Sequence, residues 1–255
     1  MRYLLGVAAM AMALQGSAAV KSETAVYKAG ELEFRGYVAY DDARTGKRPV
    51  VLIVHEWWGL GEHVRKVADR LAQAGYVGFA VDMYGEGKLT KDPQEAARWA
   101  GAVRGNPSVA EERFRAALNH IRKHPLADTS RMAAIGYCFG GTVCLEMARL
   151  GVDLGGVVSF HGGLASQVPM ERRKLTARVL VLHGADDPSV PAEQVKAFED
   201  EMRAARADWQ LVAYGNAVHS FTNPEANSPT ARYDAKADRR SWEAMTAFLR
   251  ELFEG

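Results

Sequence analysis

Continuous apolar runs alternate along the chain with longer stretches in which apolar residues recur every three or four positions. The apolar runs occupy residues 50–54, 76–81, 132–135, 155–160, 177–182 and 209–214. Short continuous runs of this kind are typical of parallel strands that are covered on both faces. Stretches with the length and spacing of helices occupy residues 62–74, 94–103, 108–123, 139–150, 192–205 and 237–253. This alternation predicts an α/β fold, with a mostly parallel central sheet and helices on both faces.

Residues 31–40 alternate apolar and polar side chains instead, which predicts a half-buried antiparallel strand at the edge of the sheet. The chain has 255 residues and shows no internal repeat, low-complexity segment or linker. A chain of this length suits one large α/β domain better than two small ones. We therefore expect a single domain over residues 20–255.

The first 19 residues have the pattern of a secretory signal peptide. Arg2 gives a short positive region, residues 4–14 are apolar, and small residues follow up to Ala19. The apolar run is too short to span a bilayer, and small residues suit a cleavage site. The sequence predicts an exported protein, periplasmic or secreted, with no membrane segment after cleavage at Ala19.

Composition excludes several classes of partner and cofactor. The chain has 32 Lys and Arg against 31 Asp and Glu, a net charge of +1, so nothing favours a nucleic-acid partner. His55-Glu56 lacks the second histidine of a zinc-protease helix, and no phosphate-binding glycine loop is present. His120 and His124 are expected to be solvated at a helix end. We expect no metal and no organic cofactor.

One nucleophilic side chain stands between a predicted strand and a predicted helix. Residues 136–141 read Gly-Tyr-Cys-Phe-Gly-Gly, with Cys138 flanked by glycines. This is the arrangement of a nucleophile elbow, with Cys where Ser is usual. Glycine relieves the crowding at a strained turn, and a helix N-terminus favours thiolate over thiol. The alternative is a buried structural cysteine in a glycine-rich turn.

The second cysteine, Cys144, falls in the same predicted helix. Six helical residues separate the two α-carbons by about 9 Å, which is too far for a disulfide. We expect Cys144 to fill the hydrophobic core, so that only Cys138 is chemically active.

A thiol nucleophile needs a base, and the base needs a carboxylate to orient it. Polar residues follow most of the predicted strands, and these ends gather at one edge of a parallel sheet. His219 follows the last strand, and Asp186 and Asp187 follow the strand before it. Nucleophile, acid and then histidine is the order of the α/β-hydrolases, and the spacing of Asp187 resembles their acid turn.

Six segments together resemble the dienelactone hydrolase family of α/β-hydrolases. They are His55-Glu-Trp-Trp-Gly-Leu60, Asp82-Met-Tyr84, Gly136-Tyr-Cys-Phe-Gly-Gly141, Phe160-His-Gly-Gly163, Gly184-x-x-Asp187 and His219-Ser-Phe221. They span nearly the whole chain after residue 20, in the family's order. The resemblance implies an α/β-hydrolase fold and the cleavage of small ester or lactone substrates.

The resemblance also implies a role for each residue. Cys138 would attack the carbonyl, His219 would carry the proton and Asp187 would orient His219. The backbone N–H groups of Trp57 and Phe139 would form the oxyanion hole. The resemblance further implies that Glu56 contacts the resting thiol and helps to generate thiolate when substrate arrives.

Two positions depart from the family pattern. Family members that hydrolyse dienelactone hold the substrate carboxylate with two arginines. The matching residues in this chain are Glu86 and Asn223. Neither can form a cationic clamp. The missing clamp argues against dienelactone itself and leaves the hydrolase chemistry intact. The predicted activity is therefore carboxylesterase or lactonase chemistry on a small molecule, through an acyl-cysteine, with the physiological substrate left open. The alternatives are a non-catalytic binding protein on this fold, or an acyltransferase or peptidase that uses the same triad.

Overall fold

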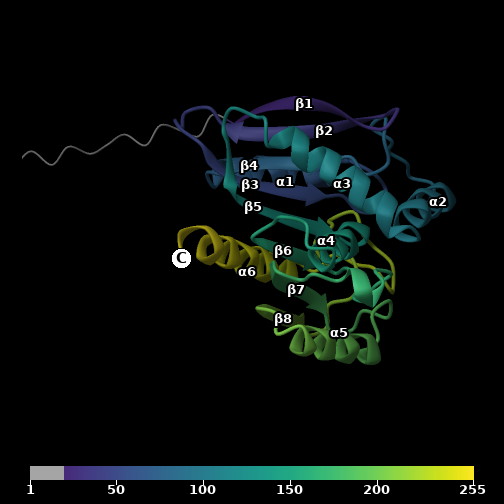
Figure 1. The fold of residues 1–255 in the computed structure, drawn as a ribbon. Helices are drawn as coiled ribbons and strands as arrows, with labels where there is room; N and C mark the ends of the chain where they lie inside the picture. Colours follow the sequence, from purple (N-terminus) through teal and green to yellow (C-terminus); the bar gives the residue numbers. More distant parts are fainter. Residues whose placement is uncertain (1–19) are drawn as a thin grey trace, which may run out of the picture.

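The computed structural model describes residues 20–255, and these form one eight-stranded sheet with helices on both faces (Figure 1). The strands are β1 (Val20–Ala29), β2 (Leu32–Asp41), β3 (Arg48–Val54), β4 (Val77–Val81), β5 (Ala127–Tyr137), β6 (Gly156–Phe160), β7 (Arg178–Gly184) and β8 (Trp209–Tyr214). Their order across the sheet is β1-β2-β4-β3-β5-β6-β7-β8. The pairs from β4 to β8 are parallel. The predicted α/β architecture is confirmed, and the predicted signal peptide lies outside the described residues.

The helices are α1 (Glu62–Gln73), α2 (Pro93–Arg104), α3 (Pro107–Ile121), α4 (Phe139–Arg149), α5 (Ala192–Ala204) and α6 (Ala235–Glu254). Helices α1 and α6 pack on one face of the sheet, and α2 to α5 pack on the other. Each face has its own apolar core, because the residues of the inner strands β3, β4, β6 and β7 are buried on both faces of the sheet. A one-turn 3₁₀ helix, Met170–Arg172, lies in the loop between β6 and β7.

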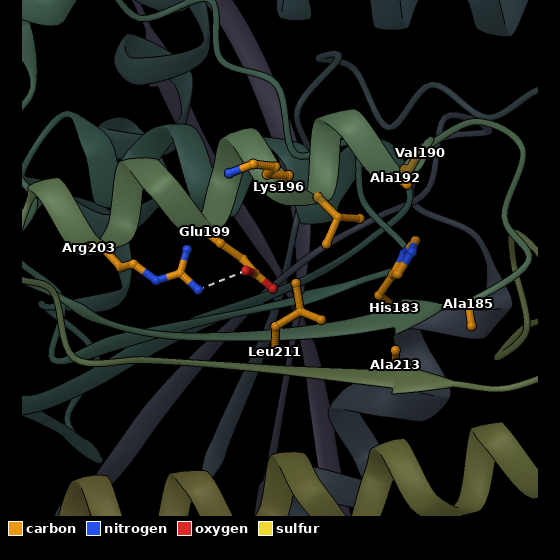
Figure 2. Close-up of a pocket in the computed structure, with 10 residues that line it drawn as sticks. His183, Ala185, Val190, Ala192, Lys196, Glu199, Arg203, Leu211 and Ala213 are labelled. Carbon is orange, nitrogen blue, oxygen red and sulfur yellow. Dashed lines mark hydrogen bonds and ion pairs between the residues drawn. The ribbon is translucent and has the colours of Figure 1, made fainter.

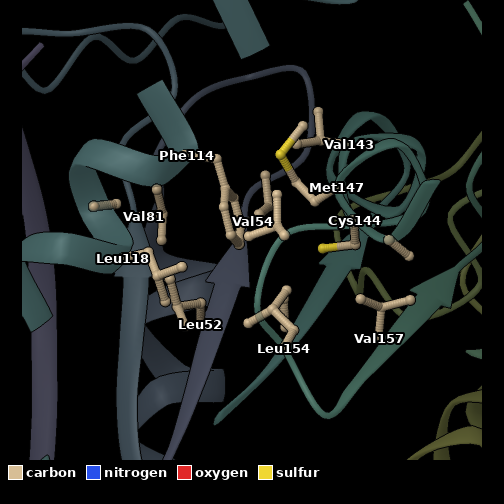
Figure 3. Packing of buried hydrophobic residues seen from close by; sticks show 14 of the residues in the cluster. Leu52, Val54, Val81, Phe114, Leu118, Val143, Cys144, Met147, Leu154 and Val157 are labelled. Carbon is tan, nitrogen blue, oxygen red and sulfur yellow. The ribbon is translucent and has the colours of Figure 1, made fainter. Parts of the chain in front are cut away.

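Cys144 lies in the core between α4 and the sheet. Figure 3 shows its side chain among Val54, Met147 and Val157. It is fully buried, and both cysteines are free. The expectation that Cys144 fills the core is confirmed.

The sheet has one more strand at its edge than the sequence predicted. Strand β1 lies beyond β2, the strand that was predicted to be at the edge. Strand β1 pairs with β2 along its whole length, and β2 also pairs with β4. Apart from its half-buried ends, only Ala25 and Tyr27 of β1 are buried. An edge strand with so few buried residues has too weak an apolar pattern to be recognised. The predicted edge strand over residues 31–40 is therefore an inner strand.

The same strand changes the surroundings of His120 and His124, so the expectation that both are solvated is wrong. The His120 ring lies 5.6 Å from that of Tyr27, and burial lowers the pKa of His120. His124 Nε2 lies 3.3 Å from a carboxylate oxygen of Glu23. Both partners belong to β1, whose presence covers the end of α3.

Candidate active site

Cys138 occupies a strained turn between β5 and α4. Its φ is +53° and its ψ is −113°, a conformation that a non-glycine residue adopts only where its surroundings impose it. A Cβ atom at Gly136 would lie 2.1 Å from the carbonyl oxygen of Gly140. A Cβ atom at Gly140 would lie 2.2 Å from the carbonyl oxygen of Val54. The two glycines therefore let α4 start directly against β5 and β3.

The structure brings Cys138, His219 and Asp187 together from three separate loops. His219 Nε2 lies 3.0 Å from Cys138 Sγ, and His219 Nδ1 lies 2.7 Å from Asp187 Oδ2. The other carboxylate oxygen of Asp187 accepts a hydrogen bond from the Ser189 backbone N–H at 2.8 Å. Asp186, the other acid that the sequence offered, is exposed. The geometry is that of a nucleophile, a base and an orienting acid in line.

The electrostatics of this cluster favour a protonated His219. Burial opposes the imidazolium, but the hydrogen bonds to Asp187 and Cys138 outweigh burial and raise the pKa of His219 to about 10. Burial likewise opposes the Asp187 carboxylate, and the His219 hydrogen bond outweighs it, so the pKa of Asp187 is lowered. A positive imidazolium next to the Asp187 carboxylate stabilises the negative charge of that carboxylate.

Neither of the two backbone N–H groups expected to form the oxyanion hole has a hydrogen-bond acceptor within residues 20–255. They belong to Trp57 and to Phe139, the first residue of α4. The Tyr84 hydroxyl donates to the Trp57 carbonyl oxygen at 3.0 Å, and His55 Nδ1 lies 2.5 Å from the Glu56 carbonyl oxygen. The Glu56 carbonyl shares a peptide plane with the Trp57 N–H, and the Trp57 carbonyl belongs to the next plane, so the two contacts hold both planes in place.

Glu56 is buried beside the triad but does not bond to the thiol. Its Oε2 accepts a hydrogen bond from Asn223 Nδ2 at 2.6 Å and lies 3.9 Å from His63 Nδ1. The hydrogen-bond partner of Cys138 Sγ is His219 instead. Burial raises the pKa of Glu56 to about 7. The contact between Glu56 and the resting thiol that the resemblance implied is therefore not the arrangement in this structure.

The raised pKa of Glu56 predicts that Glu56→Gln increases stability at alkaline pH. An acid with a raised folded-state pKa binds its proton more tightly when folded, so the free energy of unfolding falls as pH rises from about 4 to about 8. At pH 8 the ionised Glu56 costs about 3 kcal/mol. Gln keeps the acceptor for Asn223 without the charge. We expect a gain of about 1–3 kcal/mol at pH 8 that vanishes near pH 4, measured by urea unfolding.

The control for this measurement is Glu31→Gln, at an exposed position in the turn between β1 and β2. It removes the same charge without a buried environment, and we expect no pH-dependent difference from wild type. A gain for Glu56→Gln that is equal at pH 4 and pH 8 would contradict the assigned cause.

Sequence reasoning gave His161 no role, but the structure places it against the nucleophile. His161 follows β6, and its Nδ1 accepts a hydrogen bond from the Cys138 backbone N–H at 3.1 Å. Its Nε2 lies 2.8 Å from Thr222 Oγ1. The position of His161 at a strand end, next to two glycines, was the available signal. Only the tertiary structure identifies its partners.

The aromatic residues of the family segments are buried or half-buried, whereas Glu86 is at the surface. Tyr84 and Phe139 are buried and their rings are 5.4 Å apart, so both belong to the core. Trp57 and Trp58 are half-buried, with ring centroids 4.7 Å apart. Glu86 is exposed and pairs with Lys88 at 3.1 Å.

Over residues 20–255, no three His, Cys, Asp or Glu side chains are grouped so that they could hold a metal ion. No helix in the same range is both long and apolar enough to cross a membrane.

The sheet order, the elbow after β5 and the acid and histidine loops after β7 and β8 define a protein of the α/β-hydrolase class. Solved structures agree. One is a dienelactone hydrolase-like promiscuous phosphotriesterase from metagenomic libraries, which is 39% identical with a TM-score of 0.89. The match covers 92% of this chain and 99% of that one. A structure from Klebsiella pneumoniae, named "Putative Dienelactone Hydrolase", is 26% identical with a TM-score of 0.76, over 91% and 98% of the two chains.

The model of the dienelactone hydrolase family matches residues 34–253, so the chain belongs to that family and is an ester or lactone hydrolase. A relative from Salmonella typhimurium, named "Putative carboxymethylenebutenolidase", is 30% identical over 82% of this chain and 79% of its own length. A relative of the same name from Yersinia pestis is 29% identical over 88% and 85%. The resemblance seen in the sequence motifs is confirmed.

Proposed function

We propose that the protein hydrolyses small, uncharged carboxylic esters or lactones through an acyl-cysteine intermediate formed on Cys138. The observation that carries the proposal is the line of contacts from Sγ of Cys138 to His219 at 3.0 Å and from His219 to Asp187 at 2.7 Å. A nucleophile, a base and an orienting acid at these distances suit acyl transfer. The variant Cys138→Ala, measured beside Cys144→Ala, tests it.

In the first half-reaction, His219 holds the thiol proton and Cys138 Sγ attacks the substrate carbonyl as thiolate. A C–S bond forms, and the carbonyl π electrons move onto oxygen. When the tetrahedral intermediate collapses, the C–O bond to the alcohol breaks, and the leaving oxygen takes the proton from His219 Nε2. Neutral His219 and an acylated Cys138 remain.

In the second half-reaction, water replaces the alcohol. His219 Nε2 takes a proton from water, and the water oxygen attacks the thioester carbonyl. The C–S bond then breaks, the carboxylic acid leaves, and the thiolate and imidazolium are restored. Asp187 keeps His219 Nδ1 protonated throughout, so that Nε2 faces the substrate.

The oxygen that gains charge in both half-reactions lies between the N–H groups of Trp57 and Phe139 in this scheme. Both groups lack another acceptor within residues 20–255. Each donor of this kind stabilises the transition state by roughly 3–4 kcal/mol. The N-terminus of α4 adds its dipole in the same direction.

Three features favour uncharged substrates. Glu56 is a buried carboxylate beside the triad, and Asn223 binds it instead of offering a cation. Among the ion pairs of the described residues, none brings Lys or Arg to Glu56 or Asp187. A substrate carboxylate would meet like charge at short range, with no arginine to compensate.

We therefore expect kcat/KM for a neutral aryl acetate to exceed that for the mono-aryl succinate with the same leaving group by at least about tenfold at pH 8, because charge repulsion of about 1.4 kcal/mol gives that ratio. The ratio should fall at pH 6, where Glu56 is protonated, and in Glu56→Gln at any pH. Equal rates for the two esters, or faster hydrolysis of the anion, would exclude this substrate class.

The alternative functions have weaker support. A binding protein would not need the three triad side chains within hydrogen-bond distance of one another. An acyltransferase needs a site for an acyl acceptor other than water, and a peptidase needs a site for a polypeptide substrate. Nothing among the described residues provides a specific argument for either site.

We also propose that residues 1–19 form a signal peptide and that the mature protein is exported. The support is the sequence pattern alone, with cleavage after Ala19. Sequencing of the mature N-terminus is expected to begin at Val20, and recovery of the chain with Arg2 still present would contradict export by this route.

A further inference from the structure

His161 bonds both to the backbone of the nucleophile turn and to the loop of the proposed base, a combination that no other side chain of residues 20–255 shows. It lies directly after β6 and is 1% exposed. Its Nδ1 accepts from the Cys138 N–H at 3.1 Å, and its Nε2 lies 2.8 Å from Thr222 Oγ1. Thr222 follows His219 by three positions and is also buried.

The two contacts determine the tautomer of His161. A backbone N–H can only donate, so Nδ1 carries no proton, and Nε2 must hold the proton that it donates to Thr222 Oγ1. Burial, with the neighbouring charges of His219 and His63, keeps the pKa of His161 well below its usual range. His161 is therefore neutral, and both of its ring nitrogens are used.

Three residues in or near this link have backbone conformations that need support. Cys138 has φ +53°, His161 has φ +40°, and Ser220, next to His219, has φ +55°. The Cys138 N–H is shared between His161 Nδ1 and the Phe160 carbonyl oxygen at 2.9 Å. Strained residues of this kind keep their conformation only where several contacts hold them.

The ring of His161 also packs against the base loop. Its centroid lies 5.3 Å from that of His219 and 5.0 Å from that of Phe221, both edge to face. His219 and Cys138, 81 residues apart in the sequence, are thus connected through contacts of His161 as well as by their direct contact.

We propose that His161 is a positioning residue that holds Cys138 Sγ and His219 Nε2 at their working distance by bonding to Cys138 and Thr222 at once. This inference rests on the proposed function of Cys138 and His219. A misplacement of about 1 Å between reacting groups can reduce a rate by about a hundredfold, so the loss of this link affects the chemical step more than substrate binding.

A matched control is available at the end of the next strand. His183, in β7, is 5% exposed, and its Nδ1 has no partner among the described residues. Figure 2 shows it at one end of a groove of about 560 Å³ between α5 and β8. His183 is thus a buried histidine at an equivalent position, but without the link to the nucleophile.

The experiment compares His161→Phe, His161→Asn, Thr222→Val and His183→Asn in the intact protein. For each variant we measure kcat and KM on one aryl ester, the rate of Cys138 alkylation by iodoacetamide, and the melting temperature. Asn places an amide oxygen near Nδ1 and keeps an acceptor for the Cys138 N–H, whereas Phe removes both bonds. The double variant His161→Phe/Thr222→Val tests whether the two residues act through one link.

We expect kcat of His161→Phe to fall by about a hundredfold, with KM within about threefold of wild type and alkylation changed at least about tenfold. His161→Asn should retain more activity than His161→Phe. Thr222→Val should lose activity alone but add little to His161→Phe. We expect His183→Asn to stay within about threefold of wild type, as no bond joins it to Cys138.

The inference is overturned if His161→Phe lowers the melting temperature while kcat and the rate of alkylation stay unchanged. If His161→Phe does not fold, the same result for His161→Asn and Thr222→Val overturns it. If the inference about His161 fails in this way but Cys138→Ala is inactive, the proposed function still stands. If Cys138→Ala is active, the proposed function itself fails, and the assignment of His161 fails with it.

Discussion

Replacement of Cys138 by Ala is expected to lower kcat for ester and lactone hydrolysis by at least about 10³-fold, because the variant has no atom to form the acyl-enzyme. The change to alanine removes only the sulfur atom and leaves the packing of the neighbouring residues in place, so the protein should remain folded. A panel of small aryl esters and lactones, assayed with and without prior iodoacetamide, measures the effect. Alkylation of the wild type should reproduce the loss.

The control is Cys144→Ala, on the same helix. Burial raises the pKa of the Cys144 thiol, and its side chain contacts only the core, so it is inert. The Cys144→Ala variant should therefore keep most of the wild-type activity per folded molecule. Equal losses in Cys138→Ala and Cys144→Ala would show that the assay reports stability. Full activity in Cys138→Ala would exclude the thiol mechanism.

Gly140→Ala is expected to destabilise the protein by more than about 4 kcal/mol, a large part of the total stability of a typical domain. The added Cβ would lie 2.2 Å from the Val54 carbonyl oxygen and 2.7 Å from that of His55. Both atoms belong to the backbone of β3 and the segment after it, so no side chain can rotate to make room. The N-terminus of α4 would have to leave the sheet.

Urea unfolding followed by circular dichroism measures this loss, and failure to fold at 25 °C agrees with it. The matched control is Gly101→Ala, on α2, where an added Cβ meets nothing within 4 Å. Alanine is a better helix former than glycine by up to about 1 kcal/mol, so this variant should be slightly more stable than wild type. A folded Gly140→Ala within 1 kcal/mol of wild type would contradict the packing argument.

The sequence pattern was sufficient for the elements of the sheet from β3 to β8. Continuous apolar runs that are buried on both faces, such as those in β3 and β7, produce a strong local signal. Strand β1 carries almost none of this signal, because one neighbouring strand and few buried side chains hold it in place. Its absence from the prediction also explains the wrong environment assigned to His120 and His124.

The candidate triad was predictable because each member stands in a local pattern of its own. Cys138 stands in the glycine-rich elbow, Asp187 in its turn and His219 after the last strand, and the carboxyl ends of parallel strands meet at one edge. The choice between Asp186 and Asp187 followed from the spacing of the turn. In the structure Asp187 is buried against His219, whereas Asp186 is exposed.

By itself, the sequence determined the α/β architecture, the place of the nucleophile turn and the order of acid and base, since these depend on residues close together in the chain. Only the tertiary structure decided that Glu56 bonds to Asn223 and that His161 joins Cys138 to Thr222. These partners lie 167, 23 and 61 positions apart. Hydrogen bonds are directional and short, so which buried polar groups pair is settled only when packing brings their atoms within about 3 Å.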